Sequence, residues 1–346
     1  MFTYREVINI SSCCLMVVGR HLNVQRGEAD VANALIYKHQ NKLYIIDTGA
    51  LVEFKQTLHE CCSSLQPYEE VILINTHGHG DHVGNNCLID ELQVAKKSHF
   101  VSAHDLVMMK DNQSFFEKDF LSIEPFLLAE GKTAKGHLEK LIKLFEPLNV
   151  LSEHLATFET LATQDIKIGN IHWSGWNIND AVYVMKSQGH SAGHVVVYIP
   201  ELQHIHMGDE TNGYCNLFHD CDHLKSLESH TKTLSMLEEG TVKSMTDGHT
   251  FELHQSEQAI ERLSSLIDGH YVFGNEIRSW LANSSNGLLF EEIFQKAEQS
   301  KVINALPVGA NPNATYLKLQ LLSKCKDLGI VADQADILTA RFNFIY

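Results

Sequence analysis

Residues 75–84, NTHGHGDHVG, place three histidines and one aspartate within six consecutive positions. Glycines stand between them, and because glycine permits tight turns, the imidazoles of His77 and His79 can point at one ion. Asp81 and His82 can then reach a second ion. Imidazole together with carboxylate suits borderline ions such as zinc, and no cysteine lies in the motif. The pattern therefore indicates a pair of adjacent metal ions rather than a structural thiolate site.

Two metal ions need more ligands than one loop supplies, and further candidates follow later apolar segments. His190 stands on a glycine-flanked turn in SQGHSAGHVVVY, Asp209 follows a strand in HMGDE, and His249 follows residues 242–245 in TDGHT. Loops at the ends of strands are where side chains from distant parts of a chain converge on a ligand. We therefore expect these three residues to meet the motif at 75–84.

The segments predicted to position these residues are mostly strands. Residues 33–49 predict a β-hairpin, and a helix follows near residues 51–64. Residues 71–77, VILINTH, form a continuous apolar strand whose end places the histidines in a loop. Later strands are predicted in DIKIGNIHW, AVYVMKS, HVVVYIP and LQHIHMGD. In the last of these, His204 and His206 alternate with apolar residues, and we interpret them as one structural or solvated strand face.

Two other parts of the chain have helical spacing. Within residues 85–165, VSAHDLVMMKD, FFEKDFLSIEPFLLAEG and HLEKLIKLFEPL repeat apolar residues every three or four positions. Core packing is the first interpretation of these stripes. A lid over the metal site is the second, because a long insertion after a metal motif often shapes the pocket. The helical pattern returns from about residue 255 to the end of the chain.

In its motif and its later histidines and aspartate, the chain resembles the metallo-β-lactamase fold superfamily of dinuclear hydrolases. The HxHxDH signature of that family is fully matched within residues 77–82, and the resemblance extends over about residues 15–260. It implies the α/β class, with an αββα metallo-β-lactamase sandwich, a helical insertion and a helical C-terminal extension. Asp47, in the DTG before the motif, resembles the family's aspartate that supports the metal ligands from behind.

The resemblance also implies a role for each ligand. Three residues hold the first ion, three hold the second, and one bridges them: His77, His79 and His190; Asp81, His82 and His249; and Asp209. Two divalent ions are implied, zinc first, with iron or manganese as alternatives.

Hydrolysis is the chemistry that such a pair of ions supports, because a water shared by two cations loses a proton near neutral pH. Asp81 could orient the resulting hydroxide and pass its proton to the leaving group. Tyr214, five residues beyond Asp209, could donate a hydrogen bond to a developing oxyanion, and lactonases of this family carry a tyrosine near that position, at a shorter spacing. A purely structural role for Tyr214 is the alternative.

The ligands alone do not identify the substrate, because members of the family cut many kinds of bond. Other features of the sequence must reduce the number of candidate substrates. A net charge of −16 argues against nucleic acid and anionic membranes as partners. We therefore predict cleavage of an ester-like bond, lactone or thioester, in a small acyl substrate. Apolar residues of the insertion could wall its chain: Met108, Met109, Phe115, Phe116, Phe120, Phe126, Leu127 and Leu128. A phosphodiesterase, a regulatory effector with residual hydrolase activity and a diiron redox enzyme are the alternatives.

The sequence also suggests an organisation and a location. We expect a metallo-β-lactamase fold domain over residues 1–254, with the insertion at about 85–165, and an extension over 255–346 that resembles a degenerate winged helix. Its second helix carries few lysines, so packing or homodimerisation is favoured over DNA binding. The cysteines show no CxxC pattern, and neither a signal peptide nor a membrane-length apolar run is evident. A cytoplasmic location is expected.

Overall fold

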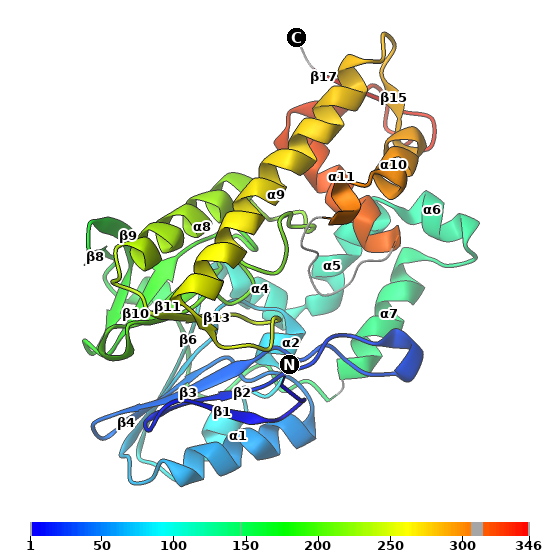
Figure 1. The fold of residues 1–346 in the computed structure, drawn as a ribbon. Helices are drawn as coiled ribbons and strands as arrows, with labels where there is room; N and C mark the ends of the chain where they lie inside the picture. Colours follow the sequence, from blue (N-terminus) through cyan, green and yellow to red (C-terminus); the bar gives the residue numbers. More distant parts are fainter. Residues whose placement is uncertain (1, 146, 306–313, 345–346) are drawn as a thin grey trace.

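The computed structural model describes residues 2–145, 147–305 and 314–344. Within these residues, two seven-stranded sheets face each other and helices cover their outer faces (Figure 1). The predicted αββα sandwich is therefore confirmed. The helical insertion and the helical C-terminal region of the prediction are also present, and both lie at one end of the sandwich (Figure 1). None of the described helices is long and apolar enough to cross a membrane.

The first sheet contains its strands in chain order: β1 (Val7–Ser11), β2 (Cys14–Val17), β3 (Ala34–His39), β4 (Lys42–Ile46), β5 (Glu70–Ile74), β6 (Lys96–Val101) and β7 (Leu155–Thr157). Strands β1 to β4 pair antiparallel, and β4 to β7 pair parallel. Because parallel strands end at the same edge, the segments after β4 and β5 lie next to each other. That edge carries the motif of residues 75–84.

The second sheet is formed by the later strands: β8 (Gln164–Ile168), β9 (Ile171–Ile178), β10 (Val182–Lys186), β11 (Val195–Ile199), β12 (His204–His206), β13 (Ser244–Thr246) and β14 (His254–Gln255). Its pairs are antiparallel except for β12 and β13. The segments after β10, β12 and β13 carry His190, Asp209 and His249.

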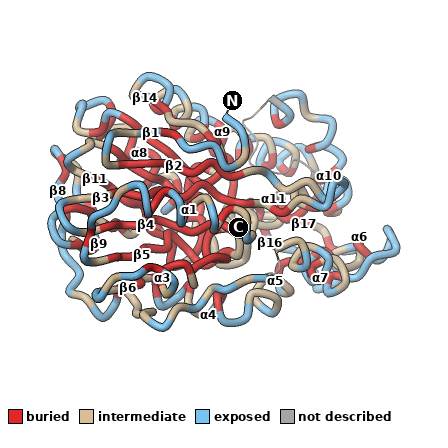
Figure 2. The backbone as a smooth tube through the Cα atoms, turned by 90° about the horizontal axis from the view of Figure 1, so that it is seen from below, coloured by how far each residue is buried: buried red, intermediate tan, exposed pale blue. Residues whose placement is uncertain are grey.

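The core between the sheets follows the alternation of side chains along each strand. Leu35 and Tyr37 of β3 pack with residues of the second sheet, whereas Ile36 between them packs against α1 (Val52–Ser64). The outer face of the second sheet is covered by α8 (His223–Glu238) and α9 (Ser256–Ala282). Figure 2 shows that buried residues are concentrated along the strands. Burial on both faces explains the continuous apolar sequences of the central strands.

The helical insertion is shorter than the region of residues 85–165 in which helices were predicted. After the short helices α2 (Gly80–Val83) and α3 (Leu88–Glu91), strand β6 adds to the first sheet before the main helices begin. These helices are α4 (Ala103–Lys110), α5 (Asn112–Leu121), α6 (Glu124–Ala129) and α7 (Ala134–Phe145). The sequence of β6, KKSHFV, has a polar half, so it lacks the apolar run that would identify a central strand.

The C-terminal extension begins with α9 and continues with short strands and two helices: β15 (Leu288–Leu289), α10 (Phe290–Gln299), α11 (Ala314–Asp327), β16 (Ile330–Ala332) and β17 (Arg341–Phe344). Its strands form a small sheet in the order β15–β17–β16. Short 3₁₀ turns complete the chain: η1 (Val24–Arg26), η2 (Phe158–Thr160), η3 (Pro200–Leu202) and η4 (Ile303–Ala305). Lys318 of α11 lies over the ring of Phe126 in α6, at 5.3 Å, so the extension packs against the insertion.

Candidate metal centre

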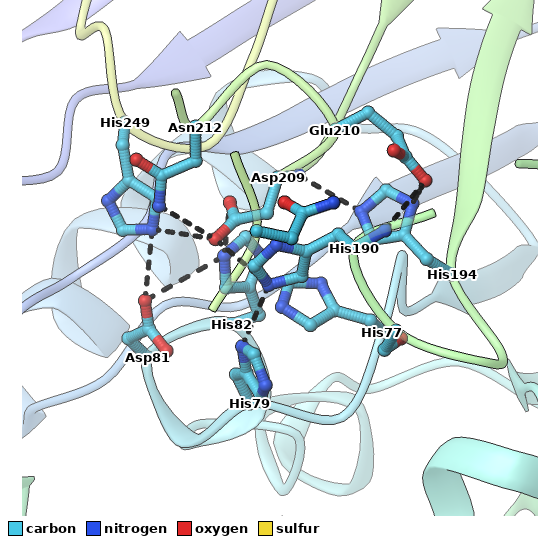
Figure 3. Close-up of polar contacts among 12 residues, drawn as sticks. His77, His79, Asp81, His82, His190, His194, Asp209, Glu210, Asn212 and His249 are labelled. Carbon is cyan, nitrogen blue, oxygen red and sulfur yellow. Dashed lines mark hydrogen bonds and ion pairs between the residues drawn. The ribbon is translucent and has the colours of Figure 1, made fainter. Parts of the chain in front are cut away.

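The structure brings the seven predicted ligands together where the ends of the two sheets meet (Figure 3). In one group, the ligand atoms of four buried residues lie within 4.8 Å of one another: His77, His79, His190 and Asp209. A second group with the same spacing contains Asp81, His82 and His249. The two groups are the same as those that the family resemblance implied, with Asp209 here counted in the first.

Asp209 lies between the two groups. Its Oδ1 atom is 3.0 Å from Nε2 of His82, and its Oδ2 atom is 3.3 Å from Nε2 of His249 and 3.6 Å from Nε2 of His190. Its carboxylate therefore faces imidazoles of both groups, which is the position of a bridging ligand (Figure 3).

The residues present fit divalent metal ions. Among the described residues, Nε2 of His77 and Nε2 of His79 are buried without a hydrogen-bond partner. Burial of such atoms is costly unless another group satisfies them. A cation at the centre of the first group would satisfy them, and the imidazoles and carboxylates of both groups suit zinc and related ions. The site can thus hold metal ions in one or both groups.

The ionisation of His77 and of Asp209 agrees with the binding of a metal ion. Burial lowers the pKa of His77 well below 6.5, and the neighbouring His82 lowers it further. Its imidazole is therefore neutral, which is the form that binds a metal. Burial opposes ionisation of Asp209, but His249 and His82 hold the pKa of its carboxyl well below the usual value. Asp209 is therefore a carboxylate at neutral pH.

Asp47 supports the motif from behind, at the place where the resemblance put it. It is fully buried, and its Oδ1 accepts a hydrogen bond from the backbone N–H of Thr76 at 2.8 Å. Its Oδ2 lies 2.8 Å from Nδ1 of His82. This contact keeps the proton of His82 on Nδ1 and leaves Nε2 pointing at Asp209, as a metal-binding histidine requires.

Two buried residues that the sequence analysis missed hold the loops of His190 and Asp209. The backbone N–H of Asp209 donates to Nε2 of His194 at 3.0 Å, so the proton of His194 is on Nδ1, which lies 3.3 Å from Glu210. Glu210 also accepts the backbone N–H of Gly189 at 2.8 Å. The only sequence signal was proximity, since His194 follows His190 by four positions and Glu210 follows Asp209 directly.

Asp30 is a third missed residue, and it stands behind His249. Its Oδ1 lies 3.4 Å from Nδ1 of His249, on the opposite side of the ring from Asp81, which lies 3.1 Å from Nε2. Asp30 thus forms an ion-pair contact with His249 that is longer than the 2.8 Å contact of Asp47 with His82. Nothing in the local sequence, EADVANA, distinguishes this aspartate from an ordinary loop residue.

A cavity of about 180 Å³ opens beside the two groups. One side is formed by His79, Asp81, His190, Asp209 and His249, and another by apolar residues of α5 and α7: Phe116, Phe120, Leu138, Leu141, Ile142 and Phe145. Of the insertion residues predicted to wall a chain, Phe116 and Phe120 line this cavity. The others are not among its lining residues, and Met108, Met109, Phe126 and Leu127 are buried in the core while Leu128 is exposed.

Tyr214 does not reach this cavity, although it follows Asp209 closely in the sequence. Its ring is buried and packs edge-on against Phe273 of α9, with centroids 5.3 Å apart. Gly269 leaves the room that the ring needs, since a Cβ there would lie 2.8 Å from Cβ of Tyr214. The large apolar surface of the ring is buried in the core instead of facing the metal groups.

His204 and His206 also lie outside the metal groups. Both are buried in β12, and His204 has hydroxyl partners on both ring nitrogens: Ser244 at 2.8 Å and Thr246 at 2.9 Å. Burial lowers the pKa of His204 to about 3, so it stays neutral. The structure therefore gives His204 a structural role in the sheet.

Comparison with known proteins places this geometry in a family. A sequence model of the Metallo-beta-lactamase superfamily matches residues 27–268. Among curated proteins none matches the chain. Similar solved structures include a beta-lactamase domain protein from Burkholderia ambifaria, with a TM-score of 0.60 at 14% identity, covering 100% of this chain and 97% of that one. A metallo-beta-lactamase family protein from Thermus thermophilus has a TM-score of 0.56 at 14% identity, with 95% and 98% coverage.

A further similar structure is a stereoselective inverting sec-alkylsulfatase from Pseudomonas sp., with a TM-score of 0.59 at 14% identity. The similarity covers 94% of this chain but 50% of the sulfatase. Identities this low show a shared fold and no more. The family model, in contrast, matches most of the sequence itself, including all seven candidate ligand positions. The chain belongs to the metallo-beta-lactamase superfamily.

Proposed function

We propose that the protein is a dinuclear metal-dependent hydrolase that cleaves an ester-like bond, a lactone or a thioester, in a small substrate with an apolar acyl chain. One observation carries the proposal. Five of the seven candidate ligands line a single cavity together with aromatic and aliphatic side chains from α5 and α7. Such a cavity suits a molecule with a polar reacting group at one end and a hydrocarbon chain at the other.

The ligand set supports hydrolysis. Two divalent ions held by it would supply a nucleophilic hydroxide near neutral pH and would polarise the scissile carbonyl. Asp81 both lines the cavity and lies 3.1 Å from Nε2 of His249. Burial opposes its ionisation, but His82 and His249 lower the pKa of Asp81 to about 2. It is therefore an ionised acceptor that can orient an attacking water by a hydrogen bond.

The apolar wall supports selectivity for substrates with a long hydrocarbon chain. Burial of each methylene group contributes about 0.8 kcal/mol, which corresponds to roughly fourfold in affinity. A substrate whose chain reaches Leu141 and Ile142 should therefore be preferred over a short one. This preference should appear in kcat/KM, because the chain remains bound in the transition state.

The test is hydrolysis of two matched series, acyl-homoserine lactones and acyl thioesters, each with short and long chains. Lactone opening is followed by proton release in weak buffer, and thioester cleavage by the thiol released. We expect saturable turnover of one series that rises with chain length, disappears after removal of metal by a chelator, and returns when zinc is added. Turnover that survives metal removal, or no turnover of either series, would contradict the proposal.

A second candidate substrate is an alkyl sulfate ester. It is favoured by the combination of the apolar wall with the similarity to a sec-alkylsulfatase. The same protein preparation should be given a secondary alkyl sulfate, and inorganic sulfate should be measured. Sulfate release at a rate above that of the lactones and thioesters would replace the acyl substrate by the sulfate ester.

A further inference from the structure

The cavity has one wall that comes from the C-terminal extension. Tyr316 and Gln320, one turn apart in α11, line it together with the metal groups. Both residues lie beyond residue 268, where the match to the family model ends. Tyr316 is the only tyrosine among the described residues that line this cavity.

Tyr316 shares the cavity with two residues of the group of Asp81, His82 and His249. These two residues are Asp81 and His249, which line the same cavity as Tyr316. A tyrosine hydroxyl has an ordinary pKa of about 10, so it is protonated near neutral pH and can act as a hydrogen-bond donor.

The helix that carries Tyr316 is fixed to the segment after the bridging aspartate. Gln320 donates from Nε2 to the carbonyl oxygen of Cys215 at 3.2 Å. Further along α11, the Ser323 hydroxyl lies 2.8 Å from Nε2 of His223, and Lys326 donates to the carbonyl oxygen of His219 at 3.2 Å. These bonds hold α11 in place relative to the loop that begins at the bridging ligand.

We propose that the hydroxyl of Tyr316 donates a hydrogen bond to an oxygen of the substrate bound at the metal groups, so that the C-terminal extension completes the active site. This role rests on the proposed function. The sequence suggested the same role, donation of a hydrogen bond to an oxyanion, for Tyr214. The structure buries Tyr214 against α9 and presents Tyr316 instead. The oxygen concerned is the one that gains negative charge during hydrolysis, where one well-placed donor has its largest effect.

The experiment compares Tyr316→Phe with the matched control Tyr214→Phe. Each change removes one hydroxyl and keeps the ring, so packing is preserved and melting temperatures check that both variants fold. With the best substrate of the lactone and thioester series, Tyr316→Phe should lower kcat about 100-fold, while KM changes less than about threefold. Tyr214→Phe should remain close to the wild-type protein in both constants. Metal content should be equal in all three proteins.

A binding measurement provides a readout that needs no turnover. Inorganic phosphate is a tetrahedral anion, and its affinity for the zinc-loaded protein can be measured by calorimetry. Loss of the donor should weaken this affinity about tenfold in Tyr316→Phe and leave it unchanged in Tyr214→Phe.

The two proposals can fail separately. If the wild-type protein hydrolyses a substrate but Tyr316→Phe equals it in kcat and in phosphate affinity, the role of Tyr316 is overturned while the hydrolase function stands. If no substrate is hydrolysed, the proposed function fails, and the phosphate titration alone decides whether Tyr316 is a hydrogen-bond donor at the metal groups. Weaker binding by Tyr316→Phe then supports a donor at the site, and equal binding overturns it.

Discussion

The two halves of the cavity are built in different ways. The metal half consists of short loops after strands β5, β10, β12 and β13, whose positions are set by the hydrogen-bonded ladders of two sheets. The apolar half consists of side chains from α5 and α7. The strand-end loops hold atoms at fixed separations, whereas the helices present a surface whose residues can change without moving the ligands. The difference suggests that reaction chemistry and substrate choice are separable in this molecule.

The strongest test of this separation is to break the metal half at its shared ligand. Asp209→Ala should lose metal from both groups and lower kcat by about a thousandfold or more, because its carboxylate faces imidazoles of each. Metal analysis and turnover should fall together. The control is Asp165→Ala, whose exposed carboxylate in β8 contacts His172 at 2.9 Å and is not among the groups that line the cavity. Turnover near the wild-type level in a metal-depleted Asp209→Ala protein would contradict the assignment.

The metal half is also the part that the sequence predicted well. Residues 77–82 are close in the chain, so the spacing of types alone constrains where the side chains can point. His190, Asp209 and His249 each follow an apolar strand, and strand ends at one sheet edge must meet. Local sequence therefore contained most of the geometry of the ligand set.

The supporting residues and the apolar half could not be predicted in the same way. Asp30 reaches His249 across more than two hundred positions, and its role depends on how the segment before β3 crosses the sandwich. Tyr214 and Tyr316 show the same limit. Distance from Asp209 along the chain favoured Tyr214, but the packing of α9 buries it, while a helix from the extension brings Tyr316 to the cavity. Tertiary packing, which cannot be read from a local sequence pattern, determines which of the two tyrosines reaches the cavity and that Asp30 reaches His249.

A smaller effect is expected when the apolar half is changed. Leu141 of α7 is half-buried and lines the cavity away from the ligands. Leu141→Ala should lower kcat/KM for a long-chain substrate about tenfold and leave a short-chain substrate within about twofold, because only the long chain loses contact. Leu128→Ala is the matched control, since this leucine of α6 is 57% exposed.

The chain-length comparison decides whether the two halves are independent. Metal content should be unchanged in both leucine variants. An equal loss for short and long substrates in Leu141→Ala would mean that α7 supports the metal half, and the separation would be lost.

The smallest expected effect is at Asp105, which contacts the loop of His190 in the metal half. This buried residue of α4 accepts a hydrogen bond from the Ser191 hydroxyl at 2.9 Å, next to the ligand His190, and its Oδ2 has no partner among the described residues. Burial raises the pKa of Asp105 to about 8, and Asp220 and Glu159 contribute in the same direction. The carboxyl is therefore protonated at neutral pH, and the amide of Asn is its closest mimic.

The direction in which stability changes with pH follows from the numbers of protons that the folded and the unfolded chain bind at Asp105. Between the unfolded pKa of 3.8 and the folded pKa of about 8, the folded protein binds more protons at Asp105 than the unfolded chain. The stability that this group contributes is therefore present below about pH 4 and is lost as the pH rises towards 8, by at most about 1.4 kcal/mol per pH unit. Asp105→Asn carries no such proton.

The melting temperatures of Asp105→Asn and of the wild-type protein should be compared at the same pH and at saturating zinc. The melting temperature of the variant minus that of the wild-type protein should increase between about pH 5 and pH 8. The gain is expected to be up to about 3 °C per pH unit. Because both proteins keep the same ligands, the pH dependence of metal binding cancels in the difference. Asp268→Asn, at an exposed position of α9, should show no such trend. A difference that does not change with pH would mean that Asp105 is ionised, and that α4 contributes a charge to the metal half rather than a neutral contact.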